Sequence, residues 1–257
     1  MSKIRKLLCR NGRLSVCEVV SALGTSEATV RRYFTIMEGN GELVRTYGGV
    51  CLPSFAGNYD YHFNVKSSSN TVEKRQIGLA AARLISSHDR LFFDSGTTVY
   101  ECENNLANFL IQGIIEDIIV CTNSLVYSEE LAKSCRFNML GGTLRVQRMD
   151  VCGMSTIANI RKHNFSKALL GADGISAEGQ LFTTDEDTSL LAEAAIEQSK
   201  EVFVLADSTK LGQSSFSAYG SLCNSRFTLI TDDKVDKALI ENYKALGIEV
   251  KIASERQ

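Results

Sequence analysis

The stretch between residues 14 and 47 constrains the fold most, because it predicts two short amphipathic helices joined by a tight turn. Ser15 and Glu18 have the spacing of a capping box, which begins a helix. Gly24 ends that helix, since glycine adopts positive φ without steric cost. The next helix places apolar side chains on one face, at Val30, Phe34 and Met37. The pattern predicts a helix-turn-helix, whose second helix lies in the major groove of DNA.

The other face of the second helix carries the small hydroxyl and guanidinium groups that suit contacts with DNA. After this helix, apolar and polar residues alternate around Gly48-Gly49, which predicts a β-hairpin, the wing of a winged helix. Arg45 and Tyr47 would then lie near phosphates or the minor groove; an ordinary loop with a stray arginine is the alternative. The predicted DNA-binding residues are Ser26, Thr29, Arg31, Arg32, Arg45 and Tyr47.

Charge is distributed unevenly along the 257 residues, whose formal net charge is −2. Residues 1–50 hold eight basic and four acidic side chains, a net charge of +4. The remaining 207 residues hold 20 basic and 26 acidic side chains, a net charge of −6. A basic N-terminal part on an acidic body favours a nucleic-acid contact confined to the N-terminal part.

The rest of the chain predicts a second domain, in which helices and strands alternate. Such alternation favours an α/β fold with a doubly wound, mostly parallel sheet. The polar region after the wing, with Gly57-Asn58 and a serine-rich run, predicts a linker. We therefore expect a DNA-binding domain at residues 1–56, a linker at 57–72 and the α/β domain at 73–257. The apolar runs of strand length are 91–93, 118–121, 137–140, 168–170, 202–205, 227–230 and 248–252, and helical segments include 98–111, 124–133, 188–199 and 233–246.

Five of the predicted strands are followed by polar residues and glycines, where ligands of doubly wound sheets bind. The first of these segments, Asp94-Ser95-Gly96-Thr97-Thr98, begins a helix, so its N–H and hydroxyl groups suit a phosphate or another oxyanion. Asp94 and Asp173 are expected to accept hydrogen bonds from sugar hydroxyls, and Lys210 to meet an anion. Turn chemistry explains any one segment, but the five together predict a polar small-molecule site. Its predicted residues are Asp94, Ser95, Gly96, Thr97, Thr98, Asn123, Ser124, Gly142, Asp173 and Lys210.

The sequence predicts no metal and no cofactor. Its eight cysteines fall singly, without Cys-x-x-Cys or Cys/His ligand spacing. We recognise no signal peptide, no lipidation motif and no run of ~18 apolar residues. We therefore expect a cytoplasmic protein that has no contact with a membrane.

Both parts of the sequence resemble one family. The N-terminal segment TSEATVRRYFTIMEGNGELVRTYGGV and the segments DSGTT, TNS, GG, GADGI and ADSTK of the body resemble the DeoR family of bacterial transcriptional regulators, over essentially the whole chain. The resemblance implies a winged helix that binds double-stranded operator DNA, usually to repress sugar-utilisation genes. It also implies a sensor domain similar to the ribose-5-phosphate isomerase fold, with a phosphorylated sugar as effector. We expect a homo-oligomer, a dimer or a tetramer, since two DNA-binding heads must meet two half-sites.

The resemblance assigns expected roles to individual residues. Ser95, Gly96, Thr97 and Thr98 match the phosphate-binding loop of the family, and Lys210 matches the lysine of its Ala-Asp-Ser-Ser-Lys signature. Asp173 falls where related isomerases keep a catalytic carboxylate. Thr29, Arg31 and Arg32 match the DNA-facing part of the recognition helix.

Two positions depart from the family pattern. Tyr33 replaces an aspartate that is common in the recognition helix, and Ala192 replaces a lysine that is common in the helix after the effector loop. An isomerase needs an acid/base pair within reach of its substrate, so the missing lysine favours a regulator that is not an enzyme. An isomerase-like sugar-phosphate enzyme with an added DNA-binding head is the alternative. A DNA-binding protein whose body only oligomerises is a third hypothesis.

Overall fold

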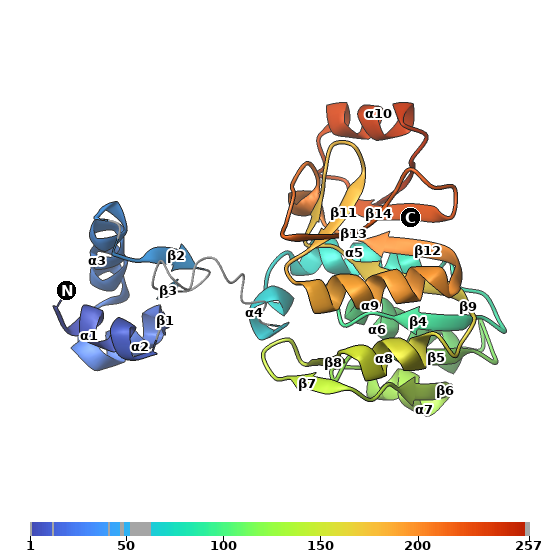
Figure 1. The fold of residues 1–257 in the computed structure, drawn as a ribbon, viewed down its shortest axis with the longest axis horizontal. Coiled ribbons are helices and arrows are strands. Elements are labelled where there is room, and N and C mark those ends of the chain that lie inside the picture. The colour runs from blue at the N-terminus through green and yellow to red at the C-terminus, as the bar shows by residue number, and fades with distance from the viewer. Residues whose placement is uncertain (1, 12, 41, 47–48, 52–62, 255–257) are drawn as a thin grey trace. The chain divides into compact units, whose positions relative to one another are not determined.

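The computed structural model describes residues 2–11, 13–40, 42–46, 49–51 and 63–254 (Figure 1). The chain divides into two compact units, residues 1–60 and residues 61–257. No helix of the described segments is long and apolar enough to cross a membrane.

The first unit is a winged helix, as predicted. Its three strands form an antiparallel sheet in the order β1-β3-β2, so the wing hairpin β2–β3 pairs with a strand that the sequence did not reveal. The elements are α1 (Ser2–Asn11), β1 (Arg13–Ser15), α2 (Val16–Leu23), α3 (Glu27–Gly39), β2 (Val44–Thr46) and β3 (Gly49–Cys51).

Local sequence signals set the helix ends in this unit. The Ser15 hydroxyl accepts the Glu18 backbone N–H at 3.1 Å, and the Glu18 carboxylate accepts the Ser15 N–H at 2.6 Å, which completes the capping box. Gly24 ends α2 with a φ of 66°. The core beneath these helices is apolar; its fully buried members include Ile4, Val19, Val30, Phe34, Met37 and Val50.

The second unit contains a seven-stranded parallel sheet in the order β15-β14-β12-β9-β4-β5-β6. Read from the β6 edge, these strands are the third, second, first, fourth, fifth, sixth and seventh of the sheet in chain order, so the order reverses between β4 and β9. This confirms the doubly wound α/β fold. The strands are β4 (Arg90–Phe93), β5 (Ile119–Thr122), β6 (Arg136–Met139), β9 (Phe165–Gly171), β12 (Ser199–Leu205), β14 (Phe227–Asp232) and β15 (Glu249–Ala253).

Helices cover both faces of this sheet (Figure 1). Because successive side chains of a strand point to opposite faces, Leu91 and Phe93 pack against one set of helices and Phe92 against the other. One set comprises α5 (Thr71–Ala82), α6 (Thr97–Ile111) and α7 (Glu129–Ser134). The other set comprises α8 (Met154–Ile160), α9 (Glu186–Glu197) and α10 (Lys237–Ala245).

Several smaller elements differ from the sequence expectation. The helix expected at 124–133 is shorter than predicted: it is α7, whose N-terminus is capped by the Ser128 side chain. Residues 124–126 form a turn instead, because the Ser124 hydroxyl accepts the Val126 N–H and donates to the Val126 carbonyl. A short helix, α4 (Phe63–Ser67), lies in the segment expected to be linker. Also unforeseen were the hairpin β7 (Thr143–Arg145) and β8 (Asp150–Cys152), the antiparallel sheet of β10 (Gly174–Ile175), β11 (Gln180–Thr183) and β13 (Ser217–Ser221), and the 3₁₀ turn η2 (Ser208–Lys210).

Candidate functional site

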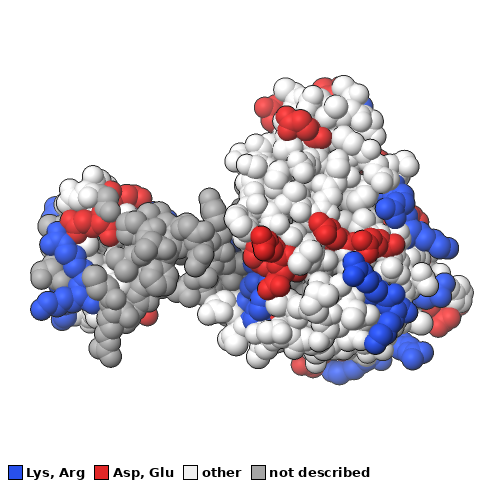
Figure 2. Space-filling model, viewed as in Figure 1, with Lys and Arg blue, Asp and Glu red and all other residues white. Residues whose placement is uncertain are grey.

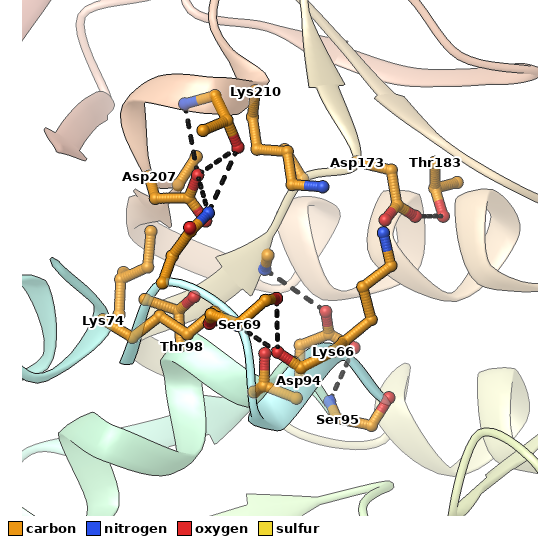
Figure 3. A pocket seen from close by; sticks show the side chains of 18 of the residues that line it. Lys66, Ser69, Lys74, Asp94, Ser95, Thr98, Asp173, Thr183, Asp207 and Lys210 are labelled. Carbon is orange, nitrogen blue, oxygen red and sulfur yellow. Dashed lines mark hydrogen bonds between the residues drawn. The ribbon is translucent and has the colours of Figure 1, made fainter. Parts of the chain in front are cut away.

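A cavity of about 240 Å³ opens at the carboxyl ends of β4, β9 and β12. It lies where the strand order reverses between β4 and β9, the position at which doubly wound sheets bind ligands. Figure 3 shows side chains that line it. The predicted ligand-binding residues found in its lining are Asp94, Ser95, Gly96, Thr97, Thr98, Asp173 and Lys210.

One wall of the cavity is the N-terminus of α6. Gly96 is the N-cap residue of this helix and offers no side chain to its backbone N–H groups. The first-turn N–H groups of a helix have no partner within the helix, and the helix dipole makes this end attractive to anions. The hydroxyls of Thr97 and Thr98 stand at the same end. The arrangement suits a phosphate or another oxyanion.

Asp94 holds the loop that precedes α6 in place through hydrogen bonds to two backbone N–H groups. Its Oδ1 accepts the Ser95 backbone N–H at 2.8 Å, and its Oδ2 accepts the Gly171 N–H at 3.2 Å. Burial raises the pKa of the Asp94 carboxyl, an effect that these two hydrogen bonds oppose. Asp94 therefore positions the loop and the neighbouring strand end. Its expected role as an acceptor for sugar hydroxyls stays a prediction, because each carboxylate oxygen can accept a further hydrogen bond.

Lysines supply positive charge from three different elements (Figure 3). Lys210 ends η2, Lys74 lies on α5 and Lys66 lies on α4. Burial lowers the pKa of both Lys66 and Lys74, and for Lys66 the charge of Lys210 lowers it further. Of these three lysines, only Lys210 was predicted from the sequence.

The lining residues that were not predicted include four from the segment 63–74, Arg148 of the β7–β8 connection, and Thr183 and Asp207. Lys66, Ser69 and Asn70 fell in the expected linker, and Arg148 precedes a strand that was not predicted. The sequence does indicate that Lys74 is unusual, because it lies three residues before Ile77, on the apolar face of α5. A lysine on such a face is buried only when its ammonium finds partners or a site.

Two carboxylates face the lysines. Asp173 Oδ2 accepts the Thr184 N–H at 3.2 Å and the Thr183 hydroxyl at 3.4 Å (Figure 3). Asp207 caps η2 by accepting the Thr209 N–H at 3.1 Å, and its Oδ1 also accepts the Asn70 side chain at 3.1 Å. These carboxylates keep acceptor capacity beyond these bonds, and polar hydroxyls of a ligand could use it.

A buried group of ion pairs supports the α6 loop. The Ser95 hydroxyl donates to Asp150 Oδ2 at 2.9 Å, and Asp150 is fully buried. Arg145 binds Asp150 at 2.7 Å and Asp185 at 2.8 Å, and Arg148 binds Asp185 at 3.0 Å. The β7–β8 hairpin is therefore fastened to the loop that begins α6.

The structure does not bring Asn123, Ser124 or Gly142 into the lining of this cavity, although we had predicted all three there. The β7–β8 hairpin covers the end of β5, since Val151 donates to the Asn123 carbonyl at 2.9 Å and Asn123 Nδ2 donates back to Val151 at 3.3 Å. Gly142 lies so close to Thr156 that a Cβ there would fall 2.0 Å from its hydroxyl. These three residues shape loops on the far side of β4.

In the first unit, α3 and its N-cap residue supply four of the six predicted DNA-binding residues. Ser26 is its N-cap, accepting the Thr29 N–H at 3.3 Å, and the two hydroxyls are 3.0 Å apart. Arg32 is exposed, and Arg31 pairs with Glu27 at 2.6 Å. The guanidinium of Arg45 lies 5.7 Å from the centre of the Phe34 ring, so part of its surface covers the core. Tyr47 lies outside the described residues.

The visible surface of the described residues carries both signs of charge. Figure 2 shows basic and acidic side chains interspersed on the face in view of each unit. Within the described ranges, no group of three or more His, Cys, Asp and Glu side chains is arranged to hold a metal ion.

Comparisons with known proteins agree with both halves of this picture. Residues 1–55 match the model of the DeoR-like helix-turn-helix domain, and residues 69–233 match that of the DeoR C-terminal sensor domain. The chain is 31% identical to the HTH-type transcriptional repressor GlcR of Bacillus subtilis, over 98% of this chain and 95% of that protein. It is 30% identical to a lactose phosphotransferase system repressor of Streptococcus mutans, over 93% of each chain.

Among solved structures, the protein is similar to ribose 5-phosphate isomerase from Plasmodium falciparum, with 16% identity over 54% of this chain and 52% of that chain and a TM-score of 0.40. The two matched models cover the winged helix and most of the α/β unit, including every residue that lines the cavity except Lys66. The chain therefore belongs to the DeoR family of DNA-binding transcriptional regulators.

Proposed function

We propose that this regulator represses sugar-utilisation genes and that a phosphorylated sugar, bound in the cavity of the second unit, controls its binding to operator DNA. The observation that carries the proposal is the meeting of the α6 N-terminus with Lys66, Lys74 and Lys210 in one cavity. Open backbone N–H groups and ammonium groups together suit a phosphate dianion.

The opposite side of the cavity supports a sugar as the rest of the ligand. Asp173 and Asp207 offer carboxylate oxygens, which are strong acceptors for hydroxyl groups. The cavity volume of about 240 Å³ is below the ~300–1,000 Å³ typical of sites for drug-sized ligands. A compact ligand with a phosphate at one end and hydroxyls at the other fits this chemistry.

The first unit supports the DNA-binding half of the proposal. The outward residues of α3, Thr29, Arg31 and Arg32, would face the major groove, and Arg45 of the wing would approach the backbone. GlcR and the lactose phosphotransferase system protein are repressors by name, which supports repression here. We propose a cytoplasmic homo-oligomer, because two heads are needed for half-sites ~34–36 Å apart.

We also propose that the protein is not an enzyme. Ala192 of α9 is buried among core side chains, so this position supplies no amine to the cavity. Asp173 is then a ligand-binding carboxylate. Turnover of pentose or hexose phosphates by the purified protein, lost in Asp173→Asn, would favour the isomerase-like alternative.

A thermal-unfolding screen tests the ligand. Purified protein is heated with ribose 5-phosphate, glucose 6-phosphate, fructose 6-phosphate, fructose 1-phosphate and the matching unphosphorylated sugars. One phosphate ester should stabilise the protein by about 2.7 kcal/mol at 100 times its Kd, and the free sugar should not. Lys210→Met should reduce the stabilisation, whereas Lys200→Met, at an exposed position of β12, should not. If no phosphorylated sugar acts even at millimolar concentration, the body only oligomerises.

A further inference from the structure

The helix α4 occupies a special place in the chain. It is the first described element after residues 52–62, and residues 61–257 form the second unit. The backbone N–H of Phe63 donates to the Gln147 carbonyl at 3.0 Å, and the buried Phe63 ring meets the Tyr100 ring of α6 edge-on at 6.5 Å. The chain that leaves the first unit therefore enters the second unit through α4. This helix packs on α6, whose N-terminus lines the cavity.

Lys66 of this helix also lines the cavity. The charged groups that face its ammonium are Lys210, Asp173, Asp207 and, across the turn, Lys74. Among the described residues neither aspartate forms an ion pair with Lys66. Figure 3 shows the Lys66 and Lys210 side chains directed toward the same space. Two ammonium groups that share a partly buried space repel each other, so an anion placed between them would be favoured.

The turn after α4 is held firmly to the cavity. The buried Lys74 ammonium donates to the Ser69 carbonyl at 2.7 Å and to the Lys66 carbonyl. The Ser69 hydroxyl donates to the same Lys66 carbonyl at 3.0 Å. Asn70 has a φ of 49°, and its side chain reaches Asp207 at the end of β12. The backbone of Lys66 is therefore coupled to the cavity wall at several points, and α4 cannot shift without changing these contacts.

We propose that Lys66 is an effector-binding residue and that α4 is the element through which effector occupancy reaches the DNA-binding unit. This inference rests on the function proposed above. An anionic group that pairs with Lys66 favours one position of α4, and that position sets where the chain departs toward the first unit. An effector changes DNA affinity only if it binds one conformation of the protein more tightly than the other. Lys66 lies in the cavity lining and on α4, the helix next to the segment that connects the two units.

The test compares two lysines of the same cavity on different elements. Operator affinity of Lys66→Met, Lys210→Met and the wild type is measured on a DNA fragment selected in vitro, with and without a saturating sugar phosphate from the screen. For the wild type, the ligand should change affinity by about 5- to 150-fold. Both variants should bind the ligand about tenfold more weakly. At saturation, Lys210→Met should keep the wild-type change and Lys66→Met should lose most of it.

Different outcomes would overturn the role of α4 and the proposed control of DNA binding by a sugar phosphate. If the ligand leaves the DNA affinity of the wild type unchanged, the proposed function fails. If the wild type responds and Lys66→Met responds equally at saturation, or if both variants lose the response equally, the role of α4 is refuted.

A second measurement covers the case in which Lys66→Met no longer binds the ligand. Hydrogen exchange of the wild-type amides at 63–70 should slow when the same sugar phosphate is added, and unchanged exchange there would refute the role of α4.

Discussion

Asp94 Oδ2 accepts a hydrogen bond of 3.2 Å from the backbone N–H of Gly171, which joins the ends of the two strands between which the sheet reverses its strand order. The other oxygen of Asp94 holds the first N–H of the loop that begins α6. One buried carboxylate thus fixes both sides of the cavity mouth, since α6 presents the anion-binding end and the segment after Gly171 carries Asp173.

Asp94→Asn tests this double role at constant size. The amide can accept only one of the two backbone N–H groups, and its NH₂ group must face the other. We expect a loss of about 1–3 kcal/mol in the free energy of unfolding, from urea titration, together with weaker binding of the sugar phosphate. The exposed Asp117→Asn should change neither quantity. Wild-type stability in Asp94→Asn would mean that the cavity mouth is held by other contacts.

DNA recognition by α3 gives the second prediction. Arg32→Ala should weaken operator binding by about 1–3 kcal/mol, or, if Arg32 contacts a phosphate, should reduce the slope of log K against log salt by about 1. Arg31→Ala should act in the same direction, although Arg31 must leave Glu27 to reach DNA. Gel shifts at several salt concentrations measure both. Arg161→Ala, in an exposed ion pair of the second unit, is the control, and equal affinity for all proteins would contradict the assignment of α3.

The wing depends on a close approach between two strands. A Cβ at Gly49 would fall 2.2 Å from the Leu14 carbonyl oxygen, whereas a Cβ at Gly39, near the end of α3, would meet nothing within 4 Å. Gly49→Ala should therefore destabilise the first unit by about 1–3 kcal/mol and weaken DNA binding, while ligand binding by the second unit persists. Gly39→Ala should instead stabilise the first unit by about 0.5–1 kcal/mol. Calorimetry of the full chain can follow both changes, and a harmless Gly49→Ala would show that β1 and β3 can separate.

A buried acid makes the stability of the second unit depend on pH. Burial among α6 and α7 side chains raises the pKa of Glu103 from 4.5 to about 8, and the Ser128 N–H at 3.0 Å opposes the shift only in part. The folded state therefore keeps a proton that the unfolded state releases between pH 4.5 and 8. The contribution of Glu103 to the free energy of unfolding thus falls as pH rises through this window.

Glu103→Gln keeps the shape and the acceptor for Ser128 but cannot ionise. Relative to the wild type, its free energy of unfolding should rise by on the order of 2–3 kcal/mol between pH 5.5 and pH 8. Urea titrations at the two pH values measure this difference. Parallel pH profiles for the two proteins would mean that Glu103 ionises normally in the folded state.

Sequence patterns were sufficient where the determining contacts are local. The capping box at Ser15, the cap at Ser26 and the apolar runs of the parallel strands each depend on neighbours within a few residues. They were insufficient where the determining contact is distant. The strand order decides that the segments after β4, β9 and β12 meet, and no local pattern encodes it.

The same limit explains the misplaced and the missed site residues. Asn123 and Gly142 follow true strands, but those strands lie beyond β4, away from the reversal point. Lys66 and Asn70 lie in a polar run that is typical of a linker, and contacts with distant residues such as Lys74 and Asp207 give that run a fixed position. Tertiary contacts, which the local sequence does not reveal, place this run at the cavity.

The most direct test of the central claim is the operator affinity of the wild-type protein with increasing concentrations of the sugar phosphate that stabilises it. We predict that the dissociation constant for DNA changes by at least about fivefold at saturation, and that the unphosphorylated sugar has no effect. A dissociation constant that stays the same when the protein is saturated with the phosphorylated sugar would contradict the account.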